Sequence, residues 1–157
     1  MGVAAKAPAV RNVAVNRQAT YEYAILERYE AGLVLTGTEI KSIRVGRANL
    51  QGSYAAAQDG ELWLHNCHIA PYEAGGVWNQ APARPRKLLL HKDEIRELAE
   101  AVATKGLTIV PLRLYLKDGR AKVELALARG KRQYDRREAI AKRDAEREIA
   151  RSLRRRS

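Results

Sequence analysis

Alternating apolar and polar positions predict that several short segments of the chain are strands. Residues 19–35 are rich in β-branched and aromatic residues and predict a first strand. Residues 107–116 and 121–128 predict two more strands, joined by a turn at residues 117–120. Because Pro111 lies inside residues 107–116, that strand is expected at a sheet edge or with a bulge.

Residues 53–72 predict a β-hairpin, because Asp59-Gly60 is a strong turn signal between two extended runs. Side chains alternate along a strand, so the second run should place two sets of residues on opposite faces. The first set is Leu62, Leu64, Asn66 and His68, and the second set is Trp63, His65, Cys67 and Ile69.

Residues 35–46 follow helical spacing. Thr36 and Glu39 have the spacing of a capping box, in which each side chain satisfies a backbone donor at the helix start. Lys41 and Arg44 are three apart and share a face that differs from the apolar one. The helix should therefore turn one face to a core and a basic face to a partner.

Residues 88–106 carry the strongest helical pattern, and Lys105-Gly106 supplies a C-terminal stop. Several strands, two to three helices and hairpin turns predict a mainly β protein with an OB-like antiparallel β-barrel. An SH3-like barrel and a sandwich fit the same pattern. We expect a flexible lead-in over residues 1–15, the barrel over residues 16–130 and a basic tail over residues 131–157.

The chain carries a formal net charge of +11, and its C-terminal end is the most basic part. Residues 129–157 contain 12 Lys or Arg against 5 Asp or Glu. Their few large apolar residues do not share one helical face, so nothing would dock a helix on the barrel. The tail is therefore expected to be disordered alone, or helical when bound to a polyanion, with a solvated tail as the alternative.

The cysteine count, the lengths of the apolar runs and the pI narrow the class of protein. One cysteine excludes an internal disulfide and fits a reducing compartment. We find no signal peptide and no run of apolar residues long enough for a membrane span, so a cytoplasmic protein is expected. The basic pI, near 10.1, favours nucleic acid over an acidic membrane surface as the partner.

No motif predicts catalysis, a metal or a cofactor. His65, Cys67 and His68 are too few for a closed zinc site, which needs four ligands. The loop "GGVWNQ" lacks the lysine and helix of a phosphate-binding loop. Glu30 and Glu39 could be the carboxylate pair of a metal-dependent nuclease, but nothing in the sequence places them together.

Three separated segments resemble one family. They are "YEAGLVLTGTEIKSIRVGRANLQGSY" (29–54), "RPRKLLLHKDEI" (84–95) and "AKVELALARGKRQYDRRE" (121–138). In this order they are similar to the SmpB (small protein B) family, which partners transfer-messenger RNA in bacterial trans-translation. The resemblance covers the chain from about Asn16 into the tail.

The resemblance implies a function and partners. The barrel would bind the tRNA-like part of transfer-messenger RNA, and the complex would enter stalled ribosomes so that the nascent peptide is tagged. The tail would occupy the decoding centre and mRNA path of the small subunit. Elongation factor Tu and alanyl-tRNA synthetase would be indirect partners through the RNA, and the protein would be a monomer without membrane contact, cofactor or enzymatic role.

The resemblance also implies site residues. The RNA-facing residues of the barrel would be Glu30, Glu39, Lys41, Ser42, Arg44, Asn66, Arg84, Arg86, Lys87, Leu89 and His91. The ribosome-facing residues of the tail would be Gly130, Lys131, Arg132, Tyr134, Asp135, Arg136, Arg137, Lys142 and Arg143. Capping by Glu39 and packing by Leu89 fit the residues equally well. A general RNA chaperone or ribosome-assembly protein is the alternative function.

Overall fold

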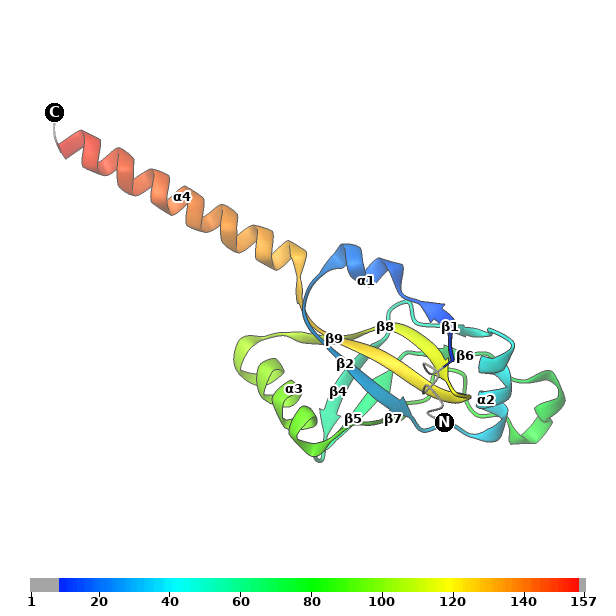
Figure 1. Ribbon diagram of the computed structural model, residues 1–157. Helices are drawn as coiled ribbons and strands as arrows, with labels where there is room; N and C mark the ends of the chain where they lie inside the picture. The colour runs from blue at the N-terminus through cyan, green and yellow to red at the C-terminus, as the bar shows by residue number, and fades with distance from the viewer. Residues whose placement is uncertain (1–8, 156–157) are drawn as a thin grey trace, which may run out of the picture.

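The computed structural model describes residues 9–155, including the side chains of residues 9–131 and 142–154. A seven-stranded antiparallel sheet runs in the order β1-β8-β4-β5-β7-β2-β9, and it closes into a barrel because β8 also pairs with β9 (Figure 1). The strands are β1 (Val10–Val15), β2 (Tyr23–Leu33), β4 (Tyr54–Gln58), β5 (Glu61–His65), β7 (Arg86–Leu89), β8 (Thr108–Lys117) and β9 (Arg120–Gly130). This architecture confirms the expected OB-like barrel.

The helices and the remaining short strands complete the chain. Strands β3 (Ala48–Asn49) and β6 (His68–Ile69) form a separate two-stranded sheet. The helices are α1 (Arg17–Glu22), α2 (Gly37–Arg44), the 3-10 helix η1 (Glu73–Trp78), α3 (Lys92–Lys105) and α4 (Lys131–Arg155). Helices α2 and α3 lie at opposite ends of the barrel, while α4 extends away from it (Figure 1).

The N-terminal segment is more ordered than its sequence pattern indicates. We expected a flexible lead-in over residues 1–15, and this is wrong for residues 10–15, which form β1 and pair with β8. The expected strand over residues 19–35 likewise begins with a helix, α1. The Asn16 side chain accepts a hydrogen bond from the Ala19 N–H (3.3 Å) at its start and donates one to the Pro111 carbonyl (2.9 Å). The Pro111 carbonyl and the β8 partners of β1 are distant in sequence, so a local pattern does not predict these pairings.

The predicted turns and the bulge are present. Asp59 and Gly60 both have positive φ between β4 and β5, and Asp118 and Gly119 do the same between β8 and β9. The β8–β9 register shifts between Pro111 and Arg113, which confirms a bulge at the proline. Strand β8 is not an edge, because it pairs with β1, β4 and β9.

The predicted helix over residues 88–106 is shorter in the structure. Its first apolar residues belong to β7, and α3 begins only at Lys92. A short apolar run is compatible with a buried strand or a buried helix, which explains the error. The C-terminal stop is confirmed, since Gly106 adopts the left-handed conformation with φ 62°.

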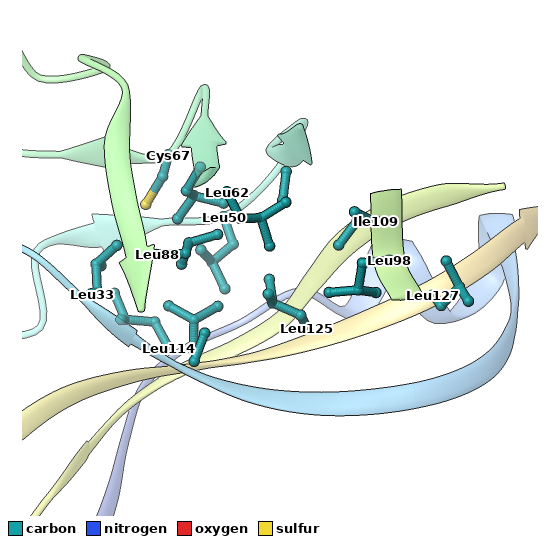
Figure 2. Close-up of a cluster of buried hydrophobic side chains, with 14 of the residues drawn as sticks. Leu33, Leu50, Leu62, Cys67, Leu88, Leu98, Ile109, Leu114, Leu125 and Leu127 are labelled. Carbon is teal, nitrogen blue, oxygen red and sulfur yellow. The ribbon is translucent and has the colours of Figure 1, made fainter. Parts of the chain in front are cut away.

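The barrel interior is filled mainly by leucines, which come from β2, β5, β7, β8 and β9 (Figure 2). Leu62, Leu64, Leu114 and Leu125 are fully buried, and Leu98 packs from α3. Truncating such a core leucine to alanine typically costs about 2–5 kcal/mol. Every residue of the buried clusters lies at or before Ala128, so the described core does not depend on α4.

Residues 131–155 form one helix, which is one of the two conformations expected for the tail. Good helix formers dominate this segment, which accounts for the helix. Ile149 and Leu153 are 62% and 63% exposed, as expected for a segment without a docking face. None of the helices within residues 9–155 has the length and apolar content required to cross a bilayer.

Candidate nucleic-acid interface

Helix α2 presents the basic face predicted from its spacing. It begins with the expected capping box: the Thr36 hydroxyl accepts from the Glu39 N–H (3.5 Å), and the Glu39 carboxylate accepts from the Thr36 N–H (2.9 Å). Ile43 is completely buried, while Lys41 and Arg44 are exposed. Two cations therefore face solvent from a helix whose start and apolar side are fixed.

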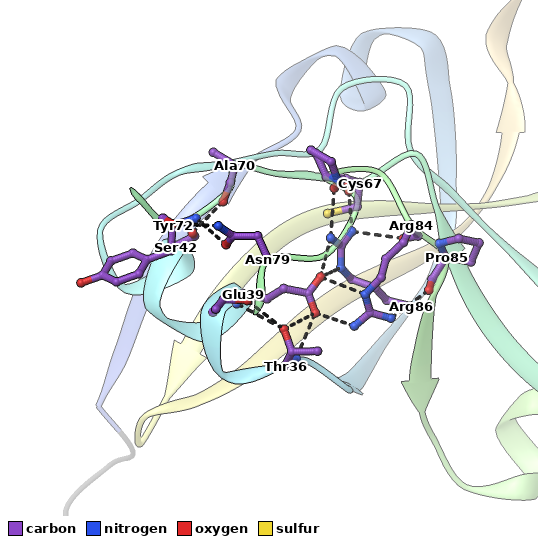
Figure 3. Close-up of polar contacts among 12 residues, drawn as sticks. Thr36, Glu39, Ser42, Cys67, Ala70, Tyr72, Asn79, Arg84, Pro85 and Arg86 are labelled. Carbon is purple, nitrogen blue, oxygen red and sulfur yellow. Dashed lines mark hydrogen bonds and ion pairs between the residues drawn. The ribbon is translucent and has the colours of Figure 1, made fainter. Parts of the chain in front are cut away.

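Glu39 is a buried anion that ties α2 to the loop before β7 (Figure 3). Its side chain is only 4% exposed. Arg84 Nε donates to Glu39 Oε2 at 3.1 Å, Arg86 Nε donates to the same oxygen at 2.6 Å, and a second Arg84 nitrogen donates to Oε1. The resemblance placed Glu39 among the RNA-facing residues, with capping as an equal alternative; in the structure Glu39 caps α2 and holds two arginines.

Arg86 is also an interior residue. Its side chain is 0% exposed. Beyond Glu39, it donates to the carbonyls of Cys67 (2.6 Å), Pro82 (3.0 Å) and Arg84 (3.2 Å). All of its guanidinium nitrogens thus have protein acceptors, and Arg86 joins two loops to α2.

The charge state of Glu39 follows from these contacts. Burial alone would raise the pKa of its carboxyl, but hydrogen bonds from Arg84, the Thr36 backbone and Arg86 outweigh burial and hold the pKa below its usual value. Glu39 is therefore ionised at neutral pH. Removing one partner from such a buried pair leaves an uncompensated charge and costs about 3–5 kcal/mol.

Ser42 is the third predicted RNA-facing residue that lies in the interior. It is completely buried, and its hydroxyl donates to the Ala70 carbonyl at 2.6 Å. This contact fastens the middle of α2 to the segment after β6 (Figure 3). Of the residues predicted on α2, only Lys41 and Arg44 reach the surface.

A second group of predicted residues lies on the outer face of β7 and just beyond it. Lys87 is half-buried and pairs with Glu61 at 2.8 Å, whereas Leu89 is 52% exposed. Leu89 pairs with Gly32 of the neighbouring strand β2. The two residues are so close that a Cβ added at Gly32 would lie 3.3 Å from the Leu89 Cβ. His91 is exposed, and its backbone N–H donates to the Glu94 carboxylate (3.2 Å) at the start of α3.

Glu30 is on the outer face of β2, but its carboxylate is occupied by protein donors. Tyr115 donates its hydroxyl to Glu30, and Lys117 Nζ lies 3.2 and 3.3 Å from the two carboxylate oxygens. The hydrogen bond from Tyr115 lowers the pKa of Glu30, burial partly opposes it, and Lys117 lowers it further. Glu30 therefore orients a tyrosine and a lysine.

Asn66 is exposed at a break in the hairpin. Its φ is 60°, and this left-handed residue ends the alternation of β5. Leu62 and Leu64 are buried before the break, while Cys67 and Ile69 are buried after it. The predicted face assignment is therefore wrong beyond His65, since one left-handed residue turns the later side chains over.

The residues considered for metal binding are separated by this break. His65 stacks on Tyr54 with ring centres 5.2 Å apart, His68 is exposed, and Cys67 is completely buried. Burial raises the pKa of the Cys67 thiol to about 11. Among the described residues, no three His, Cys, Asp or Glu side chains are grouped to hold a metal.

Sequence reasoning missed a cationic residue on the outer face of β8. The Arg113 guanidinium lies 4.2 Å from the ring centre of Tyr115, and its nitrogens donate to Glu124 (3.2 Å) and Asn12 (2.9 Å). Part of the signal was available, because Arg113 and Tyr115 alternate along the predicted strand and Lys117 follows it directly. This network extends the charged outer surface from Glu30 across the sheet.

The tail residues are only partly described. Lys131 Nζ donates to the Thr20 carbonyl at 3.0 Å, so the start of α4 touches α1, and Gly130 is the last residue of β9. Lys142 and Arg143 are exposed. The side chains of the other predicted residues, Arg132, Tyr134, Asp135, Arg136 and Arg137, lie outside the described residues.

A closed OB-like barrel with fixed surface cations and a long basic helix defines a nucleic-acid-binding protein. A sequence model of the SmpB protein family matches residues 13–155, and the chain belongs to this family. It is 62% identical over 144 residues to the SsrA-binding protein of Desulforudis audaxviator, covering 92% of this chain and 94% of the relative. The SsrA-binding protein of Carboxydothermus hydrogenoformans is 58% identical over 142 residues, covering 90% and 95%.

A solved structure supports the same assignment. A chain described under "tmRNA-SmpB: a journey to the center of the bacterial ribosome" is 56% identical and superposes with a TM-score of 0.64. The match covers 74% of this chain and 82% of that chain. Fold and sequence therefore agree on the family.

Proposed function

We propose that this protein binds the tRNA-like domain of transfer-messenger RNA and delivers it to stalled ribosomes for trans-translation. The chain belongs to the SmpB family, its relatives are named for SsrA binding, and the solved relative is described with tmRNA and the bacterial ribosome. Its action is binding rather than catalysis, in the cytoplasm where ribosomes translate. It acts as a monomer, and reaches elongation factor Tu and alanyl-tRNA synthetase only through the RNA.

The observation that carries this proposal is the fixed basic face of α2. Lys41 and Arg44 are exposed, while Glu39 beneath them is locked to Arg84 and Arg86. A fixed helix holds its cations in place before RNA arrives, so little ordering entropy is lost on binding. Neutralised phosphates release counterions, which supplies the affinity.

The outer face of β7 would extend this interface. Leu89, His91 and Asn66 are exposed and offer apolar and hydrogen-bonding groups, which suit ribose 2′-hydroxyls and base edges. Glu39, Ser42 and Arg86 contribute by positioning the surface residues. Glu30 contributes by holding Tyr115 and Lys117.

The basic tail serves a second RNA surface. We assign residues 16–130 to the transfer-messenger RNA and residues 131–157 to the decoding centre and mRNA path of the small subunit. Helix α4 extends from the barrel, and Lys142 and Arg143 are exposed along it (Figure 1). A cationic helix of this kind suits a channel lined by phosphates.

Charge reversal on α2 tests the RNA-binding part. The double variant Lys41→Glu/Arg44→Glu should weaken binding of the tRNA-like domain and reduce the salt slope of log K by about 2, one for each lost phosphate contact. A fluorescence-polarisation titration at several salt concentrations measures both quantities. The matched control is Arg96→Glu/Lys105→Glu, which reverses two exposed cations on α3 at the other end of the barrel.

The same titration includes bulk tRNA as competitor. The proposal requires the wild-type protein to prefer the tRNA-like domain at matched salt, because electrostatic attraction alone distinguishes RNAs poorly. Equal affinity for both RNAs would contradict it and favour a general RNA chaperone. An equal loss of affinity in the α2 and α3 variants would contradict the placement of the site.

A further inference from the structure

The loop of residues 72–79, here called the Trp78 loop, carries two of the most exposed apolar side chains among the described residues. Val77 is 92% exposed and Trp78 is 77% exposed. Neither residue was assigned a role from the sequence, where "GGVWNQ" served only to exclude a phosphate-binding loop. An indole that is largely exposed at the end of a loop is typical of a binding surface rather than of a core.

The Trp78 loop is held in one conformation. Asn79 closes it, accepting from the Tyr72 N–H and donating to the Tyr72 carbonyl, both at 2.9 Å (Figure 3). Gly75 is buried against Asn79, where a Cβ would lie 2.7 Å from the amide oxygen, and Gly76 has φ 51°. The loop therefore presents Trp78 at little cost in conformational entropy.

The loop lies against the basic helix α2. The Thr38 hydroxyl donates to the Trp78 carbonyl at 3.3 Å, and Lys41 Nζ lies 5.5 Å from the ring centre of Tyr72. Thr38 and Lys41 are one helical turn apart, so the loop runs along the side of α2 that carries the exposed lysine. At its base, Glu73 reaches Arg47 at 3.5 Å.

We infer that Trp78 stacks on an unpaired base of the bound RNA, next to phosphates held by Lys41 and Arg44. An aromatic side chain beside cations is the combination that binds single-stranded nucleotides, since every base has a face to stack on and a phosphate to neutralise. The neighbouring charge favours RNA over an apolar protein surface. This inference rests on the proposed RNA binding and assigns one contact within it.

Tryptophan fluorescence tests the stacking directly. The chain has two tryptophans, Trp63 and Trp78, so a Trp63→Phe protein reports on Trp78 alone. Addition of the tRNA-like domain should quench its emission to a saturating value with the same midpoint as binding. Emission that stays unchanged while polarisation shows binding would overturn the inference and leave the proposed function intact.

Affinity supplies the second readout. Trp78→Ala should weaken binding of the tRNA-like domain by roughly 5- to 100-fold, the range of base–aromatic stacking. The factor should be the same at about 0.1 M and about 0.3 M salt, because no phosphate contact is lost. Trp78→Phe keeps an aromatic face and should recover most of the affinity, which a purely structural role for the indole would not explain.

The matched control removes an equally exposed ring elsewhere. Tyr21 on α1 is 78% exposed, and Tyr21→Ala should leave the affinity for the isolated tRNA-like domain unchanged. Full affinity in Trp78→Ala would overturn the inference. If that variant bound RNA normally yet failed in peptide tagging, the Trp78 loop would instead dock a protein or the ribosome, which also contradicts base stacking.

Discussion

Three side chains decide how the α2 surface is held. Glu39, Arg84 and Arg86 form an ion-pair cluster between a helix and the loop before β7, in which Glu39 and Arg86 are buried and Arg84 is partly exposed. The desolvation of such charges is compensated only when each has good partners, and here Arg86 has four acceptor residues. The buried ion pairs of Glu39 therefore fix helix α2, and the fixed helix positions the exposed cations Lys41 and Arg44.

Replacement of Glu39 tests this cluster through the pH dependence of stability. The folded pKa of Glu39 lies below its unfolded value, so its stabilising contribution is present above about pH 4.3 and is lost as pH falls through the folded pKa. Glu39→Gln should lower the free energy of unfolding by about 3 kcal/mol at pH 7, because Arg86 loses its counter-charge. Urea unfolding at pH 7, 5 and 3 measures it.

The difference in the free energy of unfolding between wild type and Glu39→Gln should shrink as pH falls below about 4.3, because the unfolded wild-type chain then binds a proton at Glu39 that the folded chain does not yet bind. The control Glu73→Gln removes a carboxylate that is 86% exposed and should change the stability little at any pH. A difference that stayed constant with pH would show that the charge of Glu39 is not what stabilises the fold.

Part of this cluster could be predicted from the sequence. The spacing of Thr36 and Glu39 predicted the capping box, which the structure confirms. The arginines that share the same carboxylate are 45 and 47 residues away, and only the barrel brings them together. The resemblance to the family placed Glu39, Ser42 and Arg86 among the RNA-facing residues, and the sequence alone does not reveal their buried partners.

At the scale of elements, the sequence predicted those turns and helix ends that are specified by their own residues. The hairpin at Asp59-Gly60, the start of α2 and the end of α3 were predicted on that basis. Errors occurred where distant pairing decides the structure, as in β1, or where one residue reverses the pattern, as Asn66 does with its left-handed φ.

Two glycines at helix ends test whether a left-handed backbone conformation is what requires glycine at the end of α3. Gly106 has φ 62°, so Gly106→Ala should destabilise the protein by about 1–2 kcal/mol, the cost of left-handed backbone for an L-residue. Gly37→Ala, in the first turn of α2, has open space and no positive φ, and should be neutral or slightly stabilising. Urea denaturation midpoints compare the two. Equal effects would contradict the assigned role of the Gly106 conformation.

At the scale of the molecule, charge is divided between two parts. The barrel contains the described buried core and the fixed α2 cations, while α4 extends outward with exposed Lys142 and Arg143. The basic composition of the tail and its content of good helix formers were both evident from the sequence. The proposed division between two RNA surfaces follows from this arrangement.

Truncation separates the two parts. A chain ending at Gly130 keeps every residue of the buried clusters, so it should fold and bind the tRNA-like domain within a few-fold of the full chain at physiological salt. It should fail to support peptide tagging on ribosomes stalled in a reconstituted translation system. Normal tagging by this truncated chain would contradict the role proposed for the tail.

The central claim is the identity of the RNA, and the most direct measurement is sequencing of the RNA that copurifies with the full chain from its host. The proposed function predicts that transfer-messenger RNA is strongly enriched over ribosomal RNA and tRNA, and that this enrichment falls in Lys41→Glu/Arg44→Glu. Recovery of mostly ribosomal fragments, without transfer-messenger RNA, would contradict it.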